Sequence, residues 1–464
     1  MKVIVSNTLA VEDPTQEAIQ WCKKTLTIPN PEYNKKVRMH LWLGDTPKVL
    51  TLYETRGSTL ILPFGVLRSL PSCIAEEAYF TSSFADIESV SYGGQAVPLY
   101  DYQKVAVDAM VAQKYGILQS PAGSGKTQMG IALVKRLGKK ALWLTHTLDL
   151  LKQSKARAEL YIDHDLIGTI TEGKVNIGSG ITFATIQTMC KLDLPWYKNC
   201  WDLIIVDECH RCAGTPAAMT QFYKVLNNLS ARHKIGLSAT IHRADGMIAS
   251  THALLGEVVH TVPPEAVQDK IMKVGIYPIG TNVEISKSCL NTDGTLNYTK
   301  LITYLTENSY RNELIVTELE LNRHRSCLIL SDRLDHLQAL MNALPQNMRD
   351  DAVMVSGKMT TKKGKREREQ AIEDMRQGKK KYLFATYSLA KEGLDIPRLE
   401  RLFLTTPQKD YTVVTQSIGR IARTFDGKAD PIVYDFVDNI GYLVRSYKKR
   451  CATYRKNGCY FIEN

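Results

Sequence analysis

Short apolar runs alternate with helix-length segments along most of this chain, and they do so in two successive series. The first series, up to residue 240, contains GILQS, ALWLT, ITFAT, LIIVD and IGLSAT. The second series contains CLILS, AVMVS, YLFAT, LFLTT and IVYDF. Strand–helix alternation predicts a doubly wound parallel sheet, so we expect two such α/β domains in tandem. A turn-rich stretch at 261–297 separates the series and is either an ordered wedge or a linker.

The first 95 residues have a different texture from the rest of the chain. Their short apolar runs, such as KVIVS and STLILPF, are separated by Gly, Pro, Asn and Asp, which is typical of a small β-rich module. The turn-like sequence SYGGQAVPLY at 91–100 then indicates a boundary. We therefore expect a β-rich N-terminal domain over 1–95, a first α/β domain over 96–260 and a second over 261–464.

The overall charge is basic, because 59 Lys and Arg residues face 48 Asp and Glu residues, a net charge of +11. Such an excess suits a polyanionic partner, although many basic proteins bind none. We expect no signal peptide and no membrane span, since Ser6 and Asn7 interrupt the first apolar run and no stretch approaches ~18 apolar residues. Ten cysteines without a dense spacing pattern favour free thiols in a reducing cytoplasm, the host cytoplasm if the chain is viral.

The segment GILQSPAGSGKTQMGIALVKRL at 116–137 has the strand, glycine-rich turn and helix start that a phosphate-binding loop requires. Gly123 and Gly125 allow backbone N–H groups to wrap around an anion, and the helix that follows presents its positive end. Lys126 would reach the β- and γ-phosphates of a nucleotide, and the hydroxyl of Thr127 would bind Mg²⁺. The alternative is a loop that only caps a helix, which is rare for Gly-Lys-Thr in this context.

Two adjacent acids, Asp207 and Glu208, follow the apolar run LIIV, which is typical of a buried strand. Burial of two carboxylates is costly unless a positive charge compensates it, and a bound cation would do so. The carboxyl ends of the strands in an α/β sheet line one crevice, so we expect this strand end to meet the phosphate-binding loop. Asp207 would then hold Mg²⁺, and Glu208 would orient or deprotonate the attacking water.

The sequence Asp207-Glu208-Cys209-His210 is a DExH box, and the chain from about 98 to 445 resembles the superfamily 2 DExH-box helicases. Further motifs of that superfamily follow in the expected order: LYDYQ, LTHTLDLLKQ, TFATIQTM, SAT, LILSDRLDHL, FATYSLAKEGLDIP and QSIGRIAR. With the small N-terminal module, they resemble XPB-type helicases and the phage branch-migration helicases that remodel forked and branched DNA. The resemblance implies two RecA-like domains, with ATP between them and nucleic acid across both.

The resemblance also implies roles for residues in both α/β domains. Gln103 of LYDYQ would contact the adenine edge, and the arginines of QSIGRIAR would neutralise charge on the γ-phosphoryl group. The catalytic candidates are Lys126, Asp207, Glu208, Gln416, Arg420 and Arg423. The candidates for binding ATP are Gln103, Gly123, Ser124, Gly125, Lys126, Thr127, Gly393 and Asp395, and the candidate Mg²⁺ ligands are Thr127 and Asp207.

Other motifs of the superfamily hold the phosphates of a nucleic-acid strand with hydroxyls and helix ends. XPB-type helicases also carry Arg-Glu-Asp shortly after SAT, a segment implicated in DNA opening. Here it reads Arg243-Ala244-Asp245, without the acidic middle residue, and its alternative role is an ion pair that holds a helix. The candidates for nucleic-acid contact are Thr145, His146, Thr185, Gln187, Arg243, Ser331, Arg333 and Thr386.

Two further segments could contact DNA, and each has a structural alternative. The N-terminal module carries basic and aromatic residues that could contact phosphates and stack on bases, although such aromatics are more often core: Tyr33, Lys35, Lys36, Arg38, Trp42 and Tyr53. The densest basic run, 358–381, could also contact phosphates, but a charge run is more often a solvated helix face.

The leading hypothesis is an ATP-dependent DNA helicase or branch-migration motor, with ATP and Mg²⁺ as cofactors and forked or branched DNA as partner. An RNA helicase, or a duplex translocase that does not separate strands, is the alternative, because backbone contacts hardly distinguish these substrates. A nucleic-acid clamp that binds ATP without useful turnover fits less well, since the catalytic residues are present. Polarity, step size and oligomeric state stay open.

Overall fold

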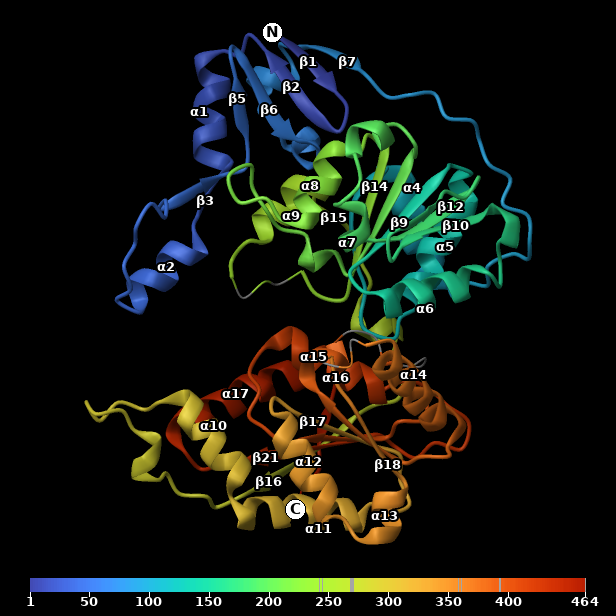
Figure 1. Cartoon of the computed structure of the whole chain (residues 1–464). Coiled ribbons are helices and arrows are strands. Elements are labelled where there is room, and N and C mark those ends of the chain that lie inside the picture. Colours follow the sequence, from blue (N-terminus) through green and yellow to red (C-terminus); the bar gives the residue numbers. More distant parts are fainter. Residues whose placement is uncertain are drawn as a thin grey trace. The chain divides into compact units, whose positions relative to one another are not determined.

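The computed structural model describes residues 1–241, 243, 245–267, 271–357, 359, 361–391 and 394–463. The chain divides into two compact units, Met1–Pro121 with Gly125–Pro263, and Ala122–Ser124 with Pro264–Asn464. The first unit contains the N-terminal module and an α/β domain, and the second contains another α/β domain (Figure 1).

The N-terminal module is a mixed sheet with short helices. Its five strands within the described residues have the order β5-β6-β2-β1-β7, with β1 and β7 parallel and the other neighbours antiparallel. These strands are β1 (Lys2–Val5), β2 (Thr8–Glu12), β5 (Glu54–Arg56), β6 (Thr59–Pro63) and β7 (Tyr79–Ser82). The other elements are α1 (Gln16–Thr25), β3 (Thr27–Pro29), α2 (Pro31–Arg38), β4 (Val49–Thr51), the 3₁₀ helix η1 (Phe64–Ser69) and α3 (Ser72–Ala75).

The first α/β domain has an eight-stranded sheet within the described residues, in the order β11-β10-β12-β9-β13-β14-β8-β15. Neighbouring strands are parallel except β10 and β11. The strands are β8 (Tyr115–Gln119), β9 (Ala141–Thr145), β10 (Ile167–Thr171), β11 (Lys174–Asn176), β12 (Ile181–Thr185), β13 (Leu203–Asp207), β14 (His233–Ser238) and β15 (Val258–Thr261). The helices are α4 (Asp101–Gln113), α5 (Lys126–Leu137), α6 (Leu148–Ala158), α7 (Ile186–Met189), α8 (Gln221–Asn228) and α9 (Ile248–Leu255).

The N-terminal module packs directly against this first α/β domain. One hydrophobic cluster joins the core of the module to Tyr115 at the start of β8 and to Ala253 of α9. Gly65 of η1 approaches α9 so closely that a Cβ atom there would lie 2.3 Å from the carbonyl oxygen of His252. Such a backbone approach is open only to glycine, so the module and α9 form a tight interface.

A buried lysine lies in the same interface. The Nζ atom of Lys234, on β14, donates hydrogen bonds to the carbonyl oxygens of Leu226 at 3.2 Å and Asn7 at 3.4 Å. It also lies 4.7 Å from the ring centre of Phe64. Burial lowers the pKa of Lys234 to about 7, because the charged ammonium has lost its hydration.

The second unit has a seven-stranded sheet within the described residues, in the order β18-β19-β17-β20-β21-β16-β22, and all its neighbouring strands are parallel. The strands are β16 (Gly275–Gly280), β17 (Cys327–Ser331), β18 (Ala352–Val355), β19 (Tyr382–Thr386), β20 (Arg401–Leu404), β21 (Ile432–Val437) and β22 (Tyr460–Phe461). The helices are α10 (Tyr298–Glu307), α11 (Ser309–Leu321), α12 (Leu334–Ala343), α13 (Gln346–Asp350), α14 (Lys362–Gln377), α15 (Tyr387–Lys391), α16 (Tyr411–Ile421) and α17 (Gly441–Lys456).

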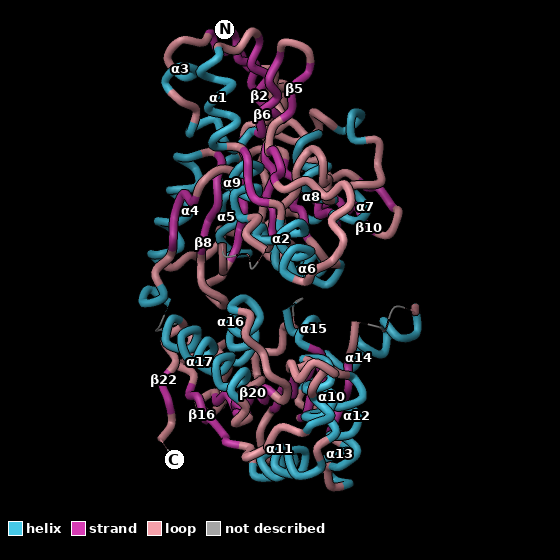
Figure 2. Tube along the Cα trace, turned by 90° about the vertical axis from the view of Figure 1, so that its left-hand side faces the viewer, coloured by secondary structure: helices cyan, strands magenta, loops and turns pink. Residues whose placement is uncertain are grey.

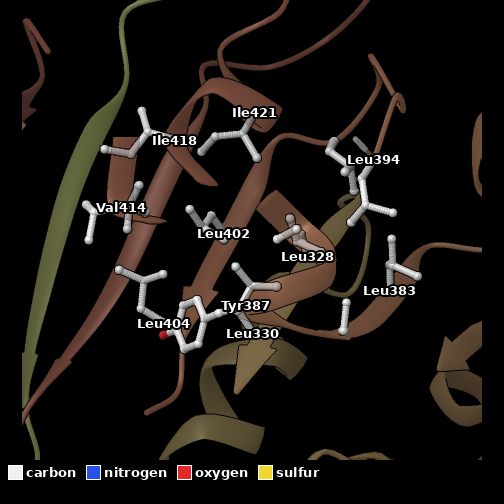
Figure 3. Packing of buried hydrophobic residues seen from close by; sticks show 14 of the residues in the cluster. Leu328, Leu330, Leu383, Tyr387, Leu394, Leu402, Leu404, Val414, Ile418 and Ile421 are labelled. Carbon is white, nitrogen blue, oxygen red and sulfur yellow. The ribbon is translucent and has the colours of Figure 1, made fainter. Parts of the chain in front are cut away.

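The core of the second unit holds α15 and α16 on the sheet. Buried side chains of these helices, among them Tyr387, Val414 and Ile418, pack against Leu402 and Leu404 of β20 (Figure 3). Helix α17 lies beside α16, as Figure 2 shows. This packing fixes the orientation of α16, which carries Gln416 and Arg420 of the QSIGRIAR motif.

The predicted fold class, two doubly wound parallel sheets with a small β-rich module, is confirmed. All ten strands predicted from apolar runs form, since the central strands are buried along their whole length. The turn-rich stretch at 261–297 is not a simple linker, because β16 lies within it and pairs with β21 over six residues. The domain boundaries near 95 and 260 stay predictions.

Candidate ATP site and nucleic-acid contacts

Three neighbouring parallel strands bring three sequence motifs to one edge of the first α/β sheet. Strand β14 lies between β8 and β13, so the phosphate-binding loop, SAT and the DExH box all begin where these strands end. The backbone N–H of Ser120 donates to the carbonyl oxygen of Ser238 at 2.9 Å, which ties the loop to SAT. The predicted meeting of the loop with the acidic strand end therefore has a direct structural basis.

The phosphate-binding loop has the backbone that its glycines were expected to provide. Gly123 and Gly125 have φ angles of +82° and +81°, which glycine adopts without strain. Helix α5 begins at Lys126, and the Nζ atom of this lysine lies 3.3 Å from the carbonyl oxygen of Ser120 and 3.4 Å from that of Pro121. The loop thus places an ammonium group and a positive helix end at one point, which suits an anionic phosphate.

Gln103 lies beside this loop. It is almost fully buried, and its Oε1 atom accepts a hydrogen bond from the backbone N–H of Tyr100 at 2.9 Å. A Cβ atom at Gly125 would lie 2.5 Å from Gln103 Nε2, so the two residues are nearly in contact. The structure therefore brings the predicted adenine-contacting residue next to the predicted phosphate site.

Asp207 is buried at the end of β13, with 5% of its surface exposed. Burial and the neighbouring Glu208 raise its pKa above the ordinary value, and the charge of Lys126 opposes that rise. Its oxygens accept a hydrogen bond from the backbone N–H of Glu208 at 3.0 Å and from Ser154 Oγ at 3.4 Å. A divalent cation would relieve the cost of burying this carboxylate beside a second one, so the residues fit Mg²⁺.

Glu208 has an unusual backbone and a defined side-chain neighbour. Its φ angle is +52°, in the left-handed region that costs a residue with a Cβ atom about 1–3 kcal/mol. Its carboxylate lies 3.3 Å from Nδ1 of His210, and the same ring nitrogen lies 3.0 Å from Ser238 Oγ. The fourth residue of the DExH box therefore contacts both the candidate general base and SAT.

Arg243 forms the ion pair that was the alternative to a role in DNA opening. Its guanidinium contacts the carboxylate of Asp245 at 2.6 Å and also donates to the carbonyl oxygen of His210. Ala244, the altered middle residue of the segment, lies outside the described residues. The segment after SAT is therefore bonded back onto the DExH box.

Most candidates for nucleic-acid contact in the first unit are buried or hydrogen-bonded to other residues of the same domain. Thr145 is fully buried, and Thr185 is nearly so and bonds through its hydroxyl to Thr188 at 3.0 Å. The side-chain amide of Gln187 donates to the carbonyl oxygen of His146, and burial lowers the pKa of this histidine to about 4. Their nucleic-acid role stays a prediction.

Three candidates of the same kind lie in the second unit. Ser331 is fully buried, and its hydroxyl contacts His336 Nδ1 at 3.0 Å and accepts from the backbone N–H of Arg333 at 3.1 Å. The side chain of Arg333 is exposed. The hydroxyl of Thr386 lies 3.0 Å from that of Ser388.

Two candidate ATP residues of the second unit contact α15 or residues that follow it. Arg420 donates to the carbonyl oxygens of Ala390 at 2.9 Å and Leu394 at 3.2 Å, and Arg423 forms an ion pair with Asp395. Gln416 is buried, and its Oε1 atom has no hydrogen-bond partner among the described residues. Gly393 lies outside the described residues.

Lys428, which lies beside Arg423 and the end of α16, was not predicted as a site residue from the sequence. The Nζ atom of Lys428 donates to three carbonyl oxygens, those of Ile421 and Arg423 at 2.7 Å and of Pro397 at 3.0 Å. It thereby connects the end of α16 with the segment that contains Asp395. No local motif marks Lys428, because its contacts depend on the folded chain.

The N-terminal candidates divide into two groups. Trp42 has 88% of its surface exposed, and no residue of α2, which carries Lys35, Lys36 and Arg38, is buried. Tyr53, by contrast, packs against the core of the module, which was its structural alternative.

Comparison with known proteins gives matches to both α/β domains. The family model described as type III restriction enzyme, res subunit, matches residues 96–243, and that described as helicase conserved C-terminal domain matches residues 310–425. The protein named "Probable helicase D10" of Escherichia phage T5 is 28% identical over 348 residues, covering 74% of this chain and 72% of that protein. The ATP-dependent DNA helicase uvsW of Enterobacteria phage T4 is 23% identical over 378 residues, covering 76% and 71%.

A solved structure has the same fold. Saccharomyces cerevisiae Dbp5, bound to RNA and ADP BeF3, matches with a TM-score of 0.54 and 18% identity over 78% of this chain and 89% of that chain. In the part of this chain that the structure describes, every helix is too short or too polar to cross a membrane.

Proposed function

Because the chain belongs to the superfamily 2 helicases and is an ATP-hydrolysing nucleic-acid helicase, we propose that it remodels forked or branched DNA. In this proposal each cycle of Mg-ATP hydrolysis moves a DNA strand relative to the protein. The substrate and the strand movement are the proposed parts.

The arrangement of Lys126, Asp207 and Glu208 at one edge of the first α/β sheet supports the catalytic part of this proposal. The ends of β8, β14 and β13 place Lys126 close enough to Asp207 to influence its pKa. We assign Lys126 to the β- and γ-phosphates, and Thr127 and Asp207 to Mg²⁺, which would stabilise the developing charge on the phosphates. Glu208 would orient or deprotonate the attacking water, since its carboxylate lies beside His210 at the edge of the sheet.

In the second unit we assign Arg420 and Arg423 to the charge on the γ-phosphoryl group during hydrolysis. Guanidinium groups suit this role because they form paired hydrogen bonds to phosphate oxygens. The ion pair between Arg423 and Asp395 would keep this guanidinium partly neutralised until a phosphate competes for it. Gln416, whose buried Oε1 has no partner among the described residues, would accept a hydrogen bond in the same cycle.

The choice of DNA rests on two observations. The uvsW protein of phage T4, which is similar over three quarters of this chain, is named as a DNA helicase. The α2 region of the N-terminal module exposes Trp42 next to basic residues, a combination that suits base stacking and phosphate contact.

Phosphate release tests this proposal in four parallel reactions, with no nucleic acid, a four-way DNA junction, linear duplex DNA and structured RNA. We expect the junction to stimulate hydrolysis most, and Lys126→Ala to reduce the stimulated rate about 100-fold or more. Lys104→Ala, which changes an exposed lysine of α4, is the matched control and should leave the rate unchanged.

Each alternative has its own outcome in this experiment. Stimulation by RNA but not by DNA would contradict the proposed DNA substrate and would support an RNA helicase with the same ATP site. Equal stimulation by linear and branched DNA would favour a duplex translocase. Bound ATP without phosphate release on any substrate would support the clamp.

A further inference from the structure

Helix α17 is strongly basic and contains no acidic residue. Six of its 16 residues are Arg or Lys. One of them, Arg450, is buried and forms an ion pair with Asp435 at 2.8 Å. The other five are exposed and form what we term the α17 strip: Arg445, Lys448, Lys449, Arg455 and Lys456.

The five side chains share one face of the helix. At about 100° of rotation per residue they fall within an arc of roughly 120°, and from Arg445 to Lys456 the strip extends about 16 Å. The α17 strip is therefore a band of positive charge along one helix face, with one group at Arg445, Lys448 and Lys449 and a second at Arg455 and Lys456.

The five residues of the strip differ from Arg450 in their ionic contacts. Within the described part of the chain, none of these five residues forms an ion pair. Two have aromatic neighbours, since Lys456 lies 4.9 Å from the ring centre of Tyr411 and Arg455 lies 5.6 Å from that of Phe461. Contact with a ring leaves the cation its full charge.

Helix α14, the densest basic run in the sequence, differs in this respect. It has the same length and six basic residues, but four acidic residues lie among them. Ion pairs join Lys363 to Glu367 at 3.8 Å and Arg376 to Glu373 at 3.4 Å. The net charge of α14 is therefore +2 (six minus four), and its potential is much weaker than that of the α17 strip.

The buried side of α17 fixes the strip to the core and to α16. Asp435 accepts hydrogen bonds from Arg450 and from the hydroxyl of Tyr454 at 2.7 Å. Just beyond the helix, the amide of Asn457 donates to Thr415 Oγ1 of α16 at 3.1 Å. A ligand on the strip would thus act on a helix that directly contacts the one carrying Arg420.

We infer that the α17 strip binds the sugar-phosphate backbone of double-stranded DNA, an inference that rests on the proposed function. Cationic side chains on one face of a helix that is fixed to the core suit the regularly spaced phosphates of a duplex, and such contacts position a duplex without reading its bases. No large apolar side chain of α17 is exposed among the described residues, so the helix itself offers no aromatic platform on which unpaired bases stack.

The salt dependence of duplex binding by the full chain tests the inference. The variant carries Arg445→Gln, Lys448→Gln and Lys449→Gln, and its matched counterpart carries Lys363→Gln, Lys365→Gln and Arg366→Gln on α14. Each phosphate contact contributes about 0.9 to the slope of log affinity against log salt concentration. We expect the α17 variant to lose about 2–3 from this slope and the α14 variant to keep the slope of the unaltered chain.

An unchanged slope in the α17 variant, or an equal loss in both variants, would overturn the inference. Thermal unfolding and hydrolysis without DNA verify that the variants are folded. If the triple variant unfolds, Arg455→Gln with Lys456→Gln replaces it, with an expected loss of about 1–2. The proposed function is judged separately on the unaltered chain, because failure of that chain to bind either duplex or branched DNA would remove the DNA assignment itself.

Discussion

The ring nitrogen Nδ1 of His210 lies 3.0 Å from the hydroxyl oxygen of Ser238. The same nitrogen contacts the carboxylate of Glu208, and the carbonyl oxygen of Ser238 accepts a hydrogen bond from Ser120 of the phosphate-binding loop. Ser238 is thus bonded to both sides of the candidate catalytic site. Ser238 therefore connects the DExH box with the phosphate-binding loop.

We expect Ser238→Ala to lower the DNA-stimulated rate of hydrolysis about 5-fold and to change the unstimulated rate little. It removes the contact of the hydroxyl with His210, worth about 1 kcal/mol, together with two hydrogen bonds between this hydroxyl and the backbone of Thr240. Phosphate release with and without junction DNA measures the ratio of the stimulated rate to the unstimulated rate. Ser288→Ala, at an exposed hydroxyl of the second unit, is the control. A proportional fall in both rates would show that Ser238 only supports the fold.

Gly65→Ala should loosen the N-terminal module from α9. The added methyl group would meet backbone atoms of His252 and Gly256 at 2.3–2.4 Å, and backbone cannot move aside as a flexible side chain does. We expect a loss of stability of about 1–3 kcal/mol, measured by denaturant unfolding. Gly280→Ala, where a Cβ atom has open space, should cost much less. Equal losses in the two variants would contradict the close approach.

Lys234 should make the stability of the first unit depend on pH. Its folded pKa is about 7, whereas the unfolded chain keeps the ordinary value of 10.5. Between these values the unfolded chain binds a proton that the folded chain does not, so stability rises with pH by at most about 1.4 kcal/mol per unit. Below pH 7 both states are protonated, and this residue adds no slope.

Denaturant unfolding of Lys234→Met at pH 7, 8 and 9 should show the loss of that rise. Lys224→Met changes an exposed lysine of α8 and should keep the slope of the unaltered chain. If the slope persists in Lys234→Met, another group is its source.

Lys428 should limit hydrolysis at alkaline pH. Burial lowers its pKa to about 8, with Glu400 opposing the shift and Arg423 adding to it. The protonated ammonium has three donors for its three carbonyl acceptors, and the neutral amine has two N–H groups. Above pH 8 one contact is therefore lost, and the end of α16 is held less firmly.

We expect kcat for ATP to fall above about pH 8 in the unaltered chain. Lys428→Met should be slower at every pH and should lack this fall, with a smaller change in KM. If kcat of Lys428→Met falls in the same way above pH 8, the fall has another residue as its source. Lys300→Met, at an exposed lysine, is the control.

The central strands could be predicted because burial on both faces makes them unbroken apolar runs. Strand β10 alternates buried and partly buried residues, and β11 is exposed throughout, so neither has that signal. Strand β16 contains Pro278, which argues against a central strand. The proline is tolerated in β16 because, within the described residues, β22 pairs with β16 only at Gly275 and Ile276. The side of β16 that faces β22 therefore has no partner strand at Pro278.

The phosphate-binding loop could be proposed from local spacing, such as a lysine at the first position of a helix, whereas the candidates in the second unit rest on the resemblance to a helicase family. The contacts of Arg243 with His210 and of Lys428 with the end of α16 could not, because they join segments that are brought together only by the fold. The sequence likewise did not indicate which basic residues form ion pairs. Basic density favours α14 in the sequence, but the uncompensated charge lies on α17.

The close approach of Gly65 to α9 has a consequence for how such a chain can change in evolution. The N-terminal module covers Tyr115, Met247 and the buried Lys234, so a lineage that lost the module would expose an apolar face prone to aggregation. Loss would therefore require several simultaneous polar substitutions on that face. We therefore expect the module and the first α/β domain to be inherited together.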